Sequence, residues 1–570
     1  MALTNHLQDA QFETSKRLLA QLVNEGLLHA YVCLPKVSHR YGLSLRSSCS
    51  EKATTEATTV IVHAKLDAYL EVEGDRVLPM LRPEYLELPI LLEHENGDTI
   101  VETDPGEIFR SLYQIVAPEG LGEASAKKII HELSTTALNQ LEWLQRQETQ
   151  RQLVVSDPAV SWEQCLVYGH PTHPFHRLCY AQPPLHSSRL ENLEEFLVPE
   201  LTLISVPRSE LQVNGPFEEC MQPLLQKLNV PAVTKDRIIM PCFTKQLPSI
   251  QHFFPGANPI ASIVDGADAQ SSMRSVALRP HLETPYILKM SLGYRITSAV
   301  RTIASWIIPE VVFMTNLLEK LLPPELWIYR EVAGVTGASG DPEQTRQISC
   351  IIREDLEPRA LEHDQALIIA AALYQHPPDS GKTYAEVLFD LNTWNKKIEW
   401  FKLYVGSLCD VILPPLAGYG IGIEAHAQNI VLRVCRQSSE LKGFAIRDWG
   451  GVRLHKPTLD SLGIKLPAVN PESPVITSDI EHIWSKFHQV FLQNHIGTIL
   501  IALGLETRGG WEIVREELSR VLAGNEYAAG PELLRYLLAD TMEMRCFFTA
   551  RLEGRPNVPL SRRVPNIVLR

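Results

Sequence analysis

The sequence predicts an α+β protein with three domains, in which mixed β-sheets occupy the first two thirds and helices dominate the last third. At 570 residues the chain is too long for one hydrophobic core. Short apolar segments between Pro-rich turns are typical of strands up to about residue 375. Helical spacing prevails beyond residue 380. We expect domains at residues 1–155, 156–380 and 381–570.

The first domain is predicted to mix helices and strands. It opens with helical spacing and continues through strand-like segments at Thr58 to His63 and Tyr85 to Leu91. Its last part, Ala126 to Gln150, places isoleucines and leucines near helical intervals, which predicts a long helix.

The second domain is predicted to be rich in strands. The segments VPELTLISVPRSEL, RIIMPCFT and ETPYILKMSLG combine β-branched residues with turn signals. We expect helices at Ser298 to Ile308 and at Glu362 to Tyr374. The segment HPPDSGKT that follows, residues 376–383, is predicted to be a surface linker.

The third domain is predicted to be mainly helical, with a small sheet. Helical patterns cover Tyr384 to Leu413 and Ile480 to Leu503, while IVLRV and GFAIRD around a polar turn indicate a hairpin.

Composition excludes several classes of function. A formal net charge of -14 and a pI near 5.8 argue against binding to a nucleic acid backbone. No run of apolar residues is long enough to span a membrane, and the polar, amphipathic N-terminus lacks the pattern of a signal peptide. The ten cysteines are scattered without CxxC pairs, as expected of free thiols in a reducing compartment. We therefore expect a cytoplasmic protein.

A histidine-dense segment, GHPTHPFHR at residues 169–177, is stiffened by two prolines. The prolines prevent one helical face from presenting all three histidines, which argues against a zinc site. The functional interpretation is a fixed loop that presents His170 and Arg177 to an anion. The alternative is a rigid structural loop whose histidines bond to backbone groups.

Cationic residues gather between SSMRS and the segment TSAVR. Lys289 lies inside an apolar strand pattern, where a charge needs a partner. A helix beginning near Thr297 would direct unpaired backbone N–H groups at an anion, with Arg301 one turn further along. Together with Ser272 and Arg274 these residues predict a triphosphate site, although a solvated surface remains the alternative.

A third constellation resembles the way kinases hold magnesium. His426, Gln428 and Asn429 precede a strand, a turn and a second strand that ends in Asp448, within IRDWGG. Asp448, together with Glu424, is the candidate magnesium ligand. A kinase also needs a catalytic Asp as base, and Gln428 occupies that neighbourhood. The chemistry expected instead is attack by a carboxylate, which is already ionised at neutral pH.

Three other motifs are rejected. Ser380 to Thr383 reads SGKT, but His376 stands where a phosphate-binding loop requires Gly. No G-x-S-x-G elbow of a serine hydrolase occurs. The sequence GIGIEA at residues 420–425 fits a weak dinucleotide pattern, but prolines interrupt the strand that should precede it.

Five segments in register, GHPTHPFHR, SSMRS, LKMSLGYRITSAVR, GIGIEAHAQN and IRDWGG, resemble the IucA/IucC family of siderophore synthetases that act independently of non-ribosomal peptide synthetases. The resemblance implies a cupped-hand fold with thumb, fingers and palm. It implies ATP and Mg²⁺ as cofactors, adenylation of citrate or a related polycarboxylic acid, and condensation with an amine or alcohol. It also implies a homodimer, while the composition predicts no nucleic acid or membrane partner.

The resemblance also implies roles for particular residues. The ATP-binding set is Ser272, Arg274, Lys289, Thr297, Gln428, Asn429 and Asp448, the carboxylate-binding set is Ser298, Arg301, His426 and Arg545, the catalytic set is His170, Arg301 and His426, and the metal ligands are Asp448 and Glu424.

Three positions depart from the family pattern. Arg177 replaces a Lys, Cys179 replaces an Arg, and Arg545 stands where a Lys is common. Arg prefers planar bidentate contacts and cannot accept a proton, so these changes indicate an altered acid or nucleophile. The competing hypotheses are a kinase-like small-molecule phosphotransferase and a degenerate carboxylate-binding homologue without catalysis.

Overall fold

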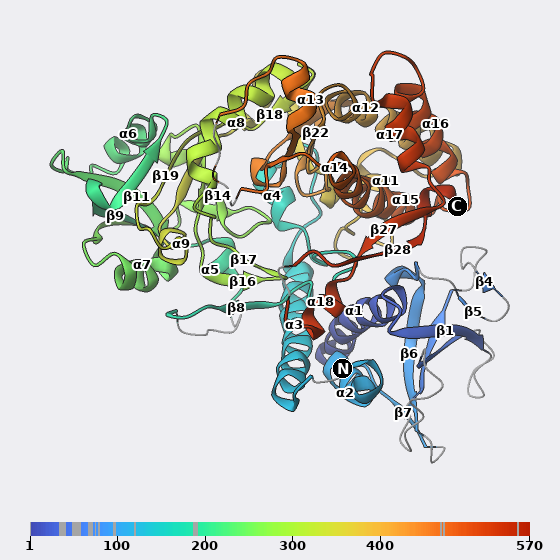
Figure 1. The fold of residues 1–570 in the computed structure, drawn as a ribbon. Helices are drawn as coiled ribbons and strands as arrows, with labels where there is room; N and C mark the ends of the chain where they lie inside the picture. Colours follow the sequence, from blue (N-terminus) through green and yellow to red (C-terminus); the bar gives the residue numbers. More distant parts are fainter. Residues whose placement is uncertain are drawn as a thin grey trace.

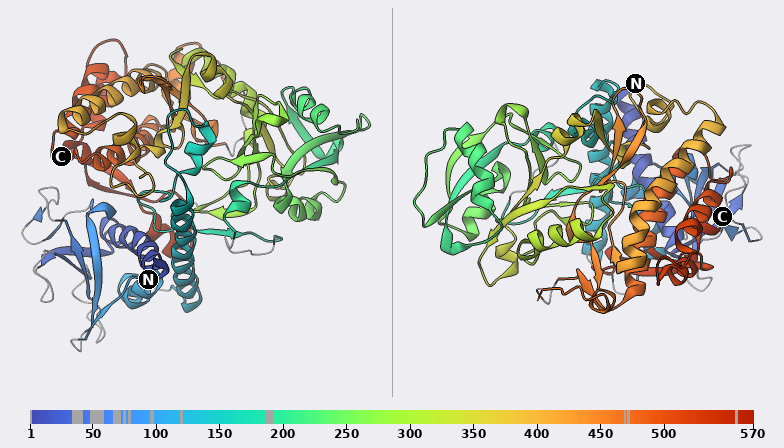
Figure 2. Two further views of the ribbon diagram at one scale, coloured as in Figure 1. Left: turned by 180° about the vertical axis from the view of Figure 1, so that it is seen from behind. Right: turned by 90° about the horizontal axis from the view of Figure 1, so that it is seen from above.

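The chain folds into three lobes. The computed structural model describes residues 2–33, 42–47, 59–65, 72–73, 76–77, 80–94, 98–118, 121–185, 192–467, 470, 473–555 and 558–570. Figure 1 shows the N-terminal lobe in blue, the central lobe in green and the C-terminal lobe in orange and red, with the long helix α3 between the first lobe and the other two. The view from behind in Figure 2 shows the same order. Each lobe has its own large hydrophobic core. The α+β class predicted from the sequence is confirmed.

The N-terminal lobe packs three helices against an antiparallel sheet of order β4-β5-β1-β2-β3-β6-β7. The predicted long helix and the two predicted strands are present as α3, β3 and β6. Thr58, the first residue of one predicted strand, lies outside the described residues. The elements are α1 (Ala2–Asn24), β1 (Leu28–Cys33), β2 (Gly42–Ser47), β3 (Thr59–Ala64), β4 (Val72–Glu73), β5 (Arg76–Val77), β6 (Leu86–Glu93), β7 (Thr99–Val101), α2 (Pro105–Val116) and α3 (Glu123–Thr149).

A short helix from the far end of the chain, α18 (Phe547–Leu552), completes the N-terminal core. Phe548 is fully buried there, with its ring 5.3 Å from that of Phe109. The Glu25 carboxylate, at the end of α1, accepts hydrogen bonds from the backbone N–H groups of Phe548 (2.8 Å) and Thr549 (2.6 Å). Figure 1 shows α18 beside α1 and α3. Both ends of the chain therefore build this lobe.

The central lobe contains a six-stranded sheet of order β10-β19-β20-β15-β14-β13 and two three-stranded sheets. These strands confirm the β-rich prediction for this part of the chain. The elements are α4 (Ala159–Gln164), β8 (Cys179–Ala181), α5 (Glu194–Leu197), β9 (Leu201–Pro207), β10 (Leu211–Asn214), α6 (Phe217–Lys227), β11 (Arg237–Phe243), α7 (Leu247–Phe253), β12 (Asn258–Ile263), β13 (Ala267–Ala269), β14 (Ser275–Leu278), β15 (Tyr286–Met290), β16 (Tyr294–Ile296), β17 (Ala299–Val300), α8 (Ile307–Leu321), β19 (Glu331–Gly337), α9 (Pro342–Thr345), β20 (Cys350–Glu354) and α10 (Glu357–Glu362).

The helix predicted at Ser298 to Ile308 is wrong. Strands β16 and β17 form a hairpin there, and the next helix, α8, begins only at Ile307. Thr297 sits in the turn with a left-handed backbone (φ 60°). Strand β16 also pairs with β8, and this long-range pairing decides the conformation over local helical spacing.

The helix predicted at Glu362 to Tyr374 is wrong as well. Helix α10 ends at Glu362, and β21 (Gln365–Ile369) then pairs with β23 before a 3₁₀ turn at Ala370–Ala372. A continuous apolar run such as this one fits a buried strand or a buried helix equally well, and sheet pairing resolves the ambiguity.

The C-terminal lobe is mainly helical around a four-stranded sheet of order β18-β24-β23-β21. The predicted hairpin is present as β23 and β24. The elements are β18 (Leu326–Ile328), α11 (Tyr384–Leu388), α12 (Trp394–Tyr419), β22 (Ile421–Gly422), β23 (Ile430–Cys435), β24 (Leu441–Ile446), β25 (Arg453–His455), α13 (Lys456–Ser461), β26 (Ile476–Thr477), α14 (Ile480–Phe487), the π-helix η8 (His488–Ile496), α15 (Gly497–Ala502), α16 (Gly510–Leu522), α17 (Gly530–Leu537), β27 (Thr541–Arg545) and β28 (Ser561–Pro565).

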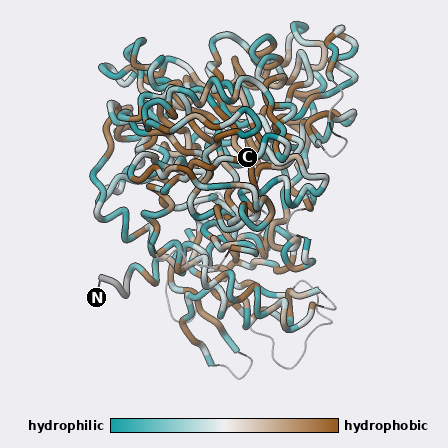
Figure 3. The backbone as a smooth tube through the Cα atoms, turned by 90° about the vertical axis from the view of Figure 1, so that its left-hand side faces the viewer, coloured by the Kyte–Doolittle hydropathy of each residue, from teal (hydrophilic) through white to brown (hydrophobic). Residues whose placement is uncertain are grey.

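Helix α12 runs through the C-terminal core and continues past its two prolines. It ends at Tyr419, six residues beyond the predicted Leu413, with Gly420 in the left-handed conformation as its cap. Within the described residues it is the one helix long and apolar enough to cross a membrane, yet 61% of that apolar stretch is buried in the core. Figure 3 shows hydrophobic stretches interleaved with hydrophilic ones along the whole chain.

Candidate functional site

A polar cavity of about 340 Å³ lies between the central and C-terminal lobes. Its walls come from the turn between β13 and β14, the segment after β17, the loop between β22 and β23, and the residues after β24. The sequence-predicted residues that line it are Ser272, Arg274, Arg301, Glu424, His426, Gln428, Asn429 and Asp448. Segments far apart in the sequence thus converge on one cavity.

Lys289 and Asp448 form an ion pair at this cavity, in which the ammonium is buried and the carboxylate is 27% exposed. Lys289, on β15, is 1% exposed, and its Nζ donates to Asp448 Oδ1 at 2.6 Å. Burial opposes ionisation of Asp448, but Lys289, Arg274 and Arg353 together hold the pKa of its carboxyl far below the usual range. Asp448 is therefore an anion with one oxygen engaged by Lys289. The prediction that Lys289 needs a partner is confirmed.

The cavity wall carries a group of guanidinium ions. Burial, together with Arg274, lowers the pKa of Arg301 to about 10, and burial lowers the pKa of Arg274 as well. Both still carry a full charge at neutral pH. Arg274 donates to the Thr302 carbonyl at 2.9 Å, but the buried Nε of each arginine has no protein partner. These unpaired donors suit a polyanionic ligand.

Sequence reasoning missed Arg353 on β20. It is 2% exposed, lines the cavity, and donates from Nη2 to Glu331 Oε1 at 2.7 Å. Glu331 also lies 3.5 Å from the Lys289 ammonium. The signal was available, because Arg353 sits in an apolar strand segment (CIIRE) just as Lys289 does.

Sequence reasoning also missed the pair Arg447 and Glu163, which fixes the opposite wall of the main cavity. Arg447 is 4% exposed and donates from Nη2 to Glu163 Oε2 (3.0 Å) and to the Gln428 carbonyl (2.7 Å). The other Glu163 oxygen also bonds to Arg447, and Ser271 N donates to Glu163 at 3.1 Å. The pair therefore positions both Gln428 and the SSMRS turn. Nothing in the sequence around Glu163, on α4, singles it out.

Glu424 is the second carboxylate at the cavity. Its Oε1 lies 3.1 Å from the ammonium of Lys486, which also donates to the Gly451 carbonyl at 2.7 Å. Burial raises the pKa of Glu424, but Lys486 and His426 lower it by more, so the pKa lies below its ordinary value. Gly451 leaves room for this carboxylate, since a Cβ there would lie 1.8 Å from Glu424 Oε2.

These two carboxylates fit a magnesium ion that is shared with a bound triphosphate. Mg²⁺ is usually held by one or two carboxylates plus substrate phosphates, with water completing the octahedron. Asp448 and Glu424 are ionised and line the same cavity. The described residues contain no cluster of three or more potential ligands, so the protein alone does not form a metal cage.

His426, which lines the cavity, and His170, which lies outside its lining, are both neutral. Burial, more than any other influence, lowers the pKa of His426, and the nearby carboxylates of Glu424 and Asp448 offset this only in part. Burial, with a contribution from His426, lowers the pKa of His170 to about 3. His170 lies outside the cavity lining, with its ring 5.5 Å from that of Phe547. A neutral imidazole can accept a proton, and the lowered pKa of His170 makes it a weak base for that role.

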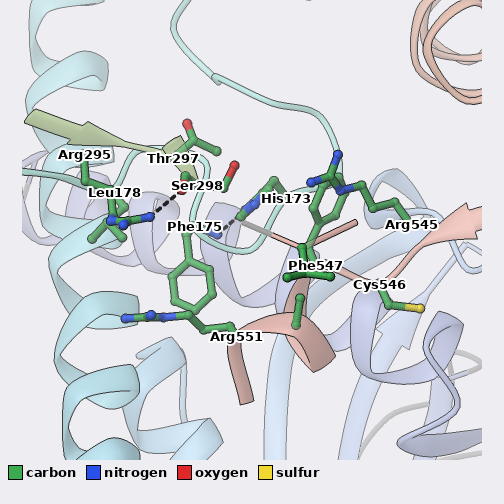
Figure 4. A pocket seen from close by; sticks show the side chains of 12 residues that line it. His173, Phe175, Leu178, Arg295, Thr297, Ser298, Arg545, Cys546, Phe547 and Arg551 are labelled. Atoms are coloured by element: carbon green, nitrogen blue, oxygen red, sulfur yellow. Dashed lines mark hydrogen bonds between the residues drawn. The ribbon is translucent and has the colours of Figure 1, made fainter. Parts of the chain in front are cut away.

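Figure 4 shows a second, much smaller pocket. Thr297, Ser298 and Arg545 line it, together with His173 and Phe547. Burial lowers the pKa of Arg545, and the Glu424 charge of the main cavity partly offsets this. The structure therefore groups these three predicted residues apart from the cations of the main cavity, and the helix N-terminus predicted at Thr297 does not exist.

The prediction that Arg177 faces an anion is wrong. Its guanidinium stacks on the Trp143 ring at 3.9 Å and donates to the Val167 carbonyl, Nη2 to O at 2.7 Å. Aromatic contact and backbone acceptors satisfy it inside the protein, so it stabilises the His-Pro loop. The neighbouring Cys179 is buried on β8, and burial raises the pKa of its thiol to about 12.

Comparison with known proteins agrees with this geometry. Residues 258–375 match the sequence model of the IucA/IucC family, and residues 398–557 match that of the ferric iron reductase FhuF-like transporters. The structure is similar to that of the petrobactin biosynthesis protein AsbB from Bacillus anthracis (TM-score 0.76, 15% identity, 99% of this chain and 96% of that one). It is also similar to ATP-bound aerobactin synthetase IucA from Klebsiella pneumoniae (TM-score 0.72, 15% identity, 98% and 99%).

Curated relatives are similar along most of the sequence. The chain is 39% identical to the NRPS-independent siderophore synthetase-like protein ankE of Aspergillus thermomutatus, over 95% of this chain and 90% of the relative. It is 28% identical to the NRPS-independent siderophore synthetase rfs of Rhizopus delemar (73% and 67%), and 22% identical to the D-ornithine–citrate ligase of Staphylococcus aureus (95% and 90%). The chain belongs to the family of NRPS-independent siderophore synthetases.

Proposed function

We propose that this protein is an ATP-dependent, AMP-forming ligase that activates one carboxylate of citrate or a related polycarboxylic acid and joins it to an amine or alcohol. The observation that carries the proposal is the main cavity, where Arg274, Lys289, Arg301 and Arg353 surround the ionised Asp448. Relatives named as citrate ligases and the ATP-bound IucA structure support the choice of substrates.

The first half-reaction joins two anions, and the cavity is built to lower their repulsion. A carboxylate oxygen of the acid attacks the α-phosphorus of ATP. The new C–O–P linkage forms as the bond from the α-phosphorus to the bridging oxygen breaks, and pyrophosphate leaves with the electron pair. No general base is required because the acid is already ionised. The arginines and Lys289 stabilise the charge that accumulates on the phosphate oxygens.

Asp448 and Glu424 are the residues that would hold magnesium together with the triphosphate. The ion would supply further positive charge at the departing pyrophosphate. Lys289 already occupies Asp448 Oδ1, which leaves the second oxygen of that carboxylate for this role.

In the second half-reaction a neutral amine attacks the carbonyl carbon of the acyl-adenylate. The C–N bond forms, the C–O bond to the phosphate breaks, and AMP leaves with the electron pair. The proton released by the amine needs an acceptor, and His426 and His170 are both neutral near this position.

Acid-dependent exchange of labelled pyrophosphate into ATP tests the first step. We expect exchange with citrate in the absence of any amine, and AMP as the nucleotide product once an amine is added. Formation of ADP with a phosphorylated small molecule would instead identify a kinase-like enzyme. Absence of ATP binding by calorimetry would identify a carboxylate-binding protein without catalysis.

A further inference from the structure

Glu424 and His426 lie on a loop, residues 423–429, that connects β22 to β23. The loop belongs to no helix or strand, so the ladder of a sheet does not fix its backbone. Ala425, between the two site residues, is fully buried, and its carbonyl oxygen lies 2.9 Å from Nδ1 of the His495 ring. A side chain from another element therefore holds the peptide that joins Glu424 to His426.

The proton positions around His495 follow from its partners. A carbonyl oxygen can only accept, so Nδ1 carries the proton and donates to Ala425. Burial lowers the pKa of His495 to about 4, so the ring is neutral and its Nε2 is an acceptor. The Tyr404 hydroxyl, 2.7 Å away, donates to this Nε2. Two hydrogen bonds in series thus run from α12 through the imidazole to the loop.

The π-helix η8, which carries His495, continues directly from α14. Lys486, in the last turn of α14, pairs with the Glu424 carboxylate at 3.1 Å. Lys486 and His495 are nine residues apart, and in an α-helix that separation is about two and a half turns, which puts the side chains on opposite faces. A π-helix bonds from i to i+5 and takes more residues per turn, so the same separation brings them to one face. One helix therefore contacts the loop twice, through the Glu424 side chain and through the Ala425 carbonyl.

Packing holds the His495 ring in this orientation. The ring lies edge-on to Tyr404 (5.9 Å between ring centres) and to Phe491 (6.0 Å), and Tyr404 stacks on Trp400 at 5.1 Å. Both His495 and Tyr404 are fully buried, and neither lines the main cavity. Apolar side chains could fill this space without the cost of burying polar atoms. The polar pair is therefore explained by the Ala425 carbonyl that it fixes.

We propose that His495 and Tyr404 are positioning residues for the reaction: they fix the peptide between Glu424 and His426, and so direct the magnesium ligand and the substrate-facing histidine into the main cavity. The inference rests on the proposed function and extends its site to the π-helix. Both residues act through the loop and not on the reacting atoms. Without them the Ala425 carbonyl is free to turn, and the two site side chains lose their fixed separation.

The test replaces His495 with leucine, which keeps much of the bulk and removes both hydrogen bonds. ATP binding is measured by calorimetry over a series of magnesium concentrations, and citrate-dependent pyrophosphate exchange is measured in parallel. His495→Leu should raise the magnesium concentration for half-maximal ATP binding about 10- to 100-fold, the loss expected when a residue behind a metal ligand is removed. The citrate KM in exchange should rise as well, because His426 is displaced. ATP binding without magnesium should stay within about threefold of wild type, because Arg274, Arg301 and Arg353 come from other elements.

His488 provides the matched control on the same π-helix. It is also buried (3% exposed), but its ring bonds to Asn566 (3.2 Å) and Gln493 (3.1 Å) and not to the loop. His488→Leu should lower stability without changing the magnesium requirement or the citrate KM. His495→Asn tests rescue, since its amide nitrogen can take the place of Nδ1, and should return the magnesium requirement to within about threefold of wild type.

An unchanged magnesium requirement in H495L would overturn the inference, and so would an equal rise in H488L or an absence of rescue in H495N. If H495L does not fold, Tyr404→Phe takes its place, because it keeps both rings and removes only the hydroxyl that donates to Nε2. It should raise the magnesium requirement about two- to fivefold. Calorimetry requires no turnover, so a wild type without pyrophosphate exchange would refute the proposed function while the binding comparison still decides the inference.

Discussion

Replacing Glu25 with glutamine should remove a pH-dependent loss of stability at the junction of the two chain ends. Glu25 is 8% exposed, and burial raises the pKa of its carboxyl from 4.5 to about 7 despite hydrogen bonds from Phe548 and Thr549. Between these pH values the unfolded chain has released the proton while the folded protein keeps it. The contribution of Glu25 to the free energy of unfolding therefore falls as the pH rises from 4.5 to 7. It does not change with pH above or below that window.

The size of the effect follows from the two pKa values. They differ by about 2.5, and each unit corresponds to about 1.4 kcal/mol, so ionised Glu25 destabilises the fold by about 3 kcal/mol at pH 8. Glutamine keeps an acceptor for the Phe548 N–H and does not titrate. The stability of E25Q relative to wild type should rise by about 3 kcal/mol between pH 4.5 and pH 8.

The assay is guanidinium unfolding of wild type and E25Q at pH 4.5 and at pH 8, in which the first unfolding transition is monitored. Glu532→Gln, on the exposed face of α17, is the control and should show no change with pH relative to wild type. A difference between E25Q and wild type that is the same at pH 4.5 and pH 8 would refute the reasoning, because it would mean that Glu25 ionises normally in the fold.

Three further substitutions test the site. Lys289→Met leaves the Asp448 carboxylate in the cavity without its ammonium partner, and should lower pyrophosphate exchange at least about 100-fold. Because this carboxylate is 27% exposed, the loss of stability should be smaller than the ~3–5 kcal/mol of a fully buried pair. Gly451→Ala should displace Glu424 and raise the magnesium concentration needed for half-maximal exchange, with little change in the unfolding midpoint. Arg177→Met should lower stability by about 2 kcal/mol through loss of the stack on Trp143, without changing KM for ATP or citrate.

Matched controls keep these outcomes interpretable. Lys442→Met removes an exposed ammonium near the start of β24 and should leave exchange intact. Gly381→Ala adds a methyl group in open space and should leave the magnesium dependence unchanged. A rise in KM for ATP in R177M would show that Arg177 acts at the ligand after all. An unfolding midpoint of G451A well below that of wild type would show that the substitution damages the fold beyond Glu424.

Local chemistry was enough to single out most of the charged residues that the structure brings together at the main cavity. A lysine in an apolar strand demands a counter-ion, and Asp448, which follows β24, supplies it from another lobe. The same reasoning applied to β20 would have found Arg353. Glu163 could not be found in this way, because its importance comes from its position opposite Arg447, which depends on the packing of α4.

Local reasoning failed where long-range pairing decides the conformation. The segment around Thr297 has helical spacing, yet β16 is held by β8, more than a hundred residues earlier in the chain. The error affected function as well as fold, because the predicted helix terminus was part of the anion site. The predicted helix ended at Leu413, just before two prolines, and prolines usually stop helices. In the structure α12 continues past both prolines because the residues on either side of them are buried in the core.

The insertion of α18 into the first lobe has a consequence for biosynthesis. During translation the N-terminal sheet and its helices emerge long before Phe548, because the central and C-terminal lobes are made in between. The apolar site that receives the Phe548 ring therefore stays uncovered while those two lobes are synthesised. The N-terminal lobe is expected to reach its final packing only after α18 has been made, and substitutions that keep α18 away from it should impair the lobe whose strands are made first.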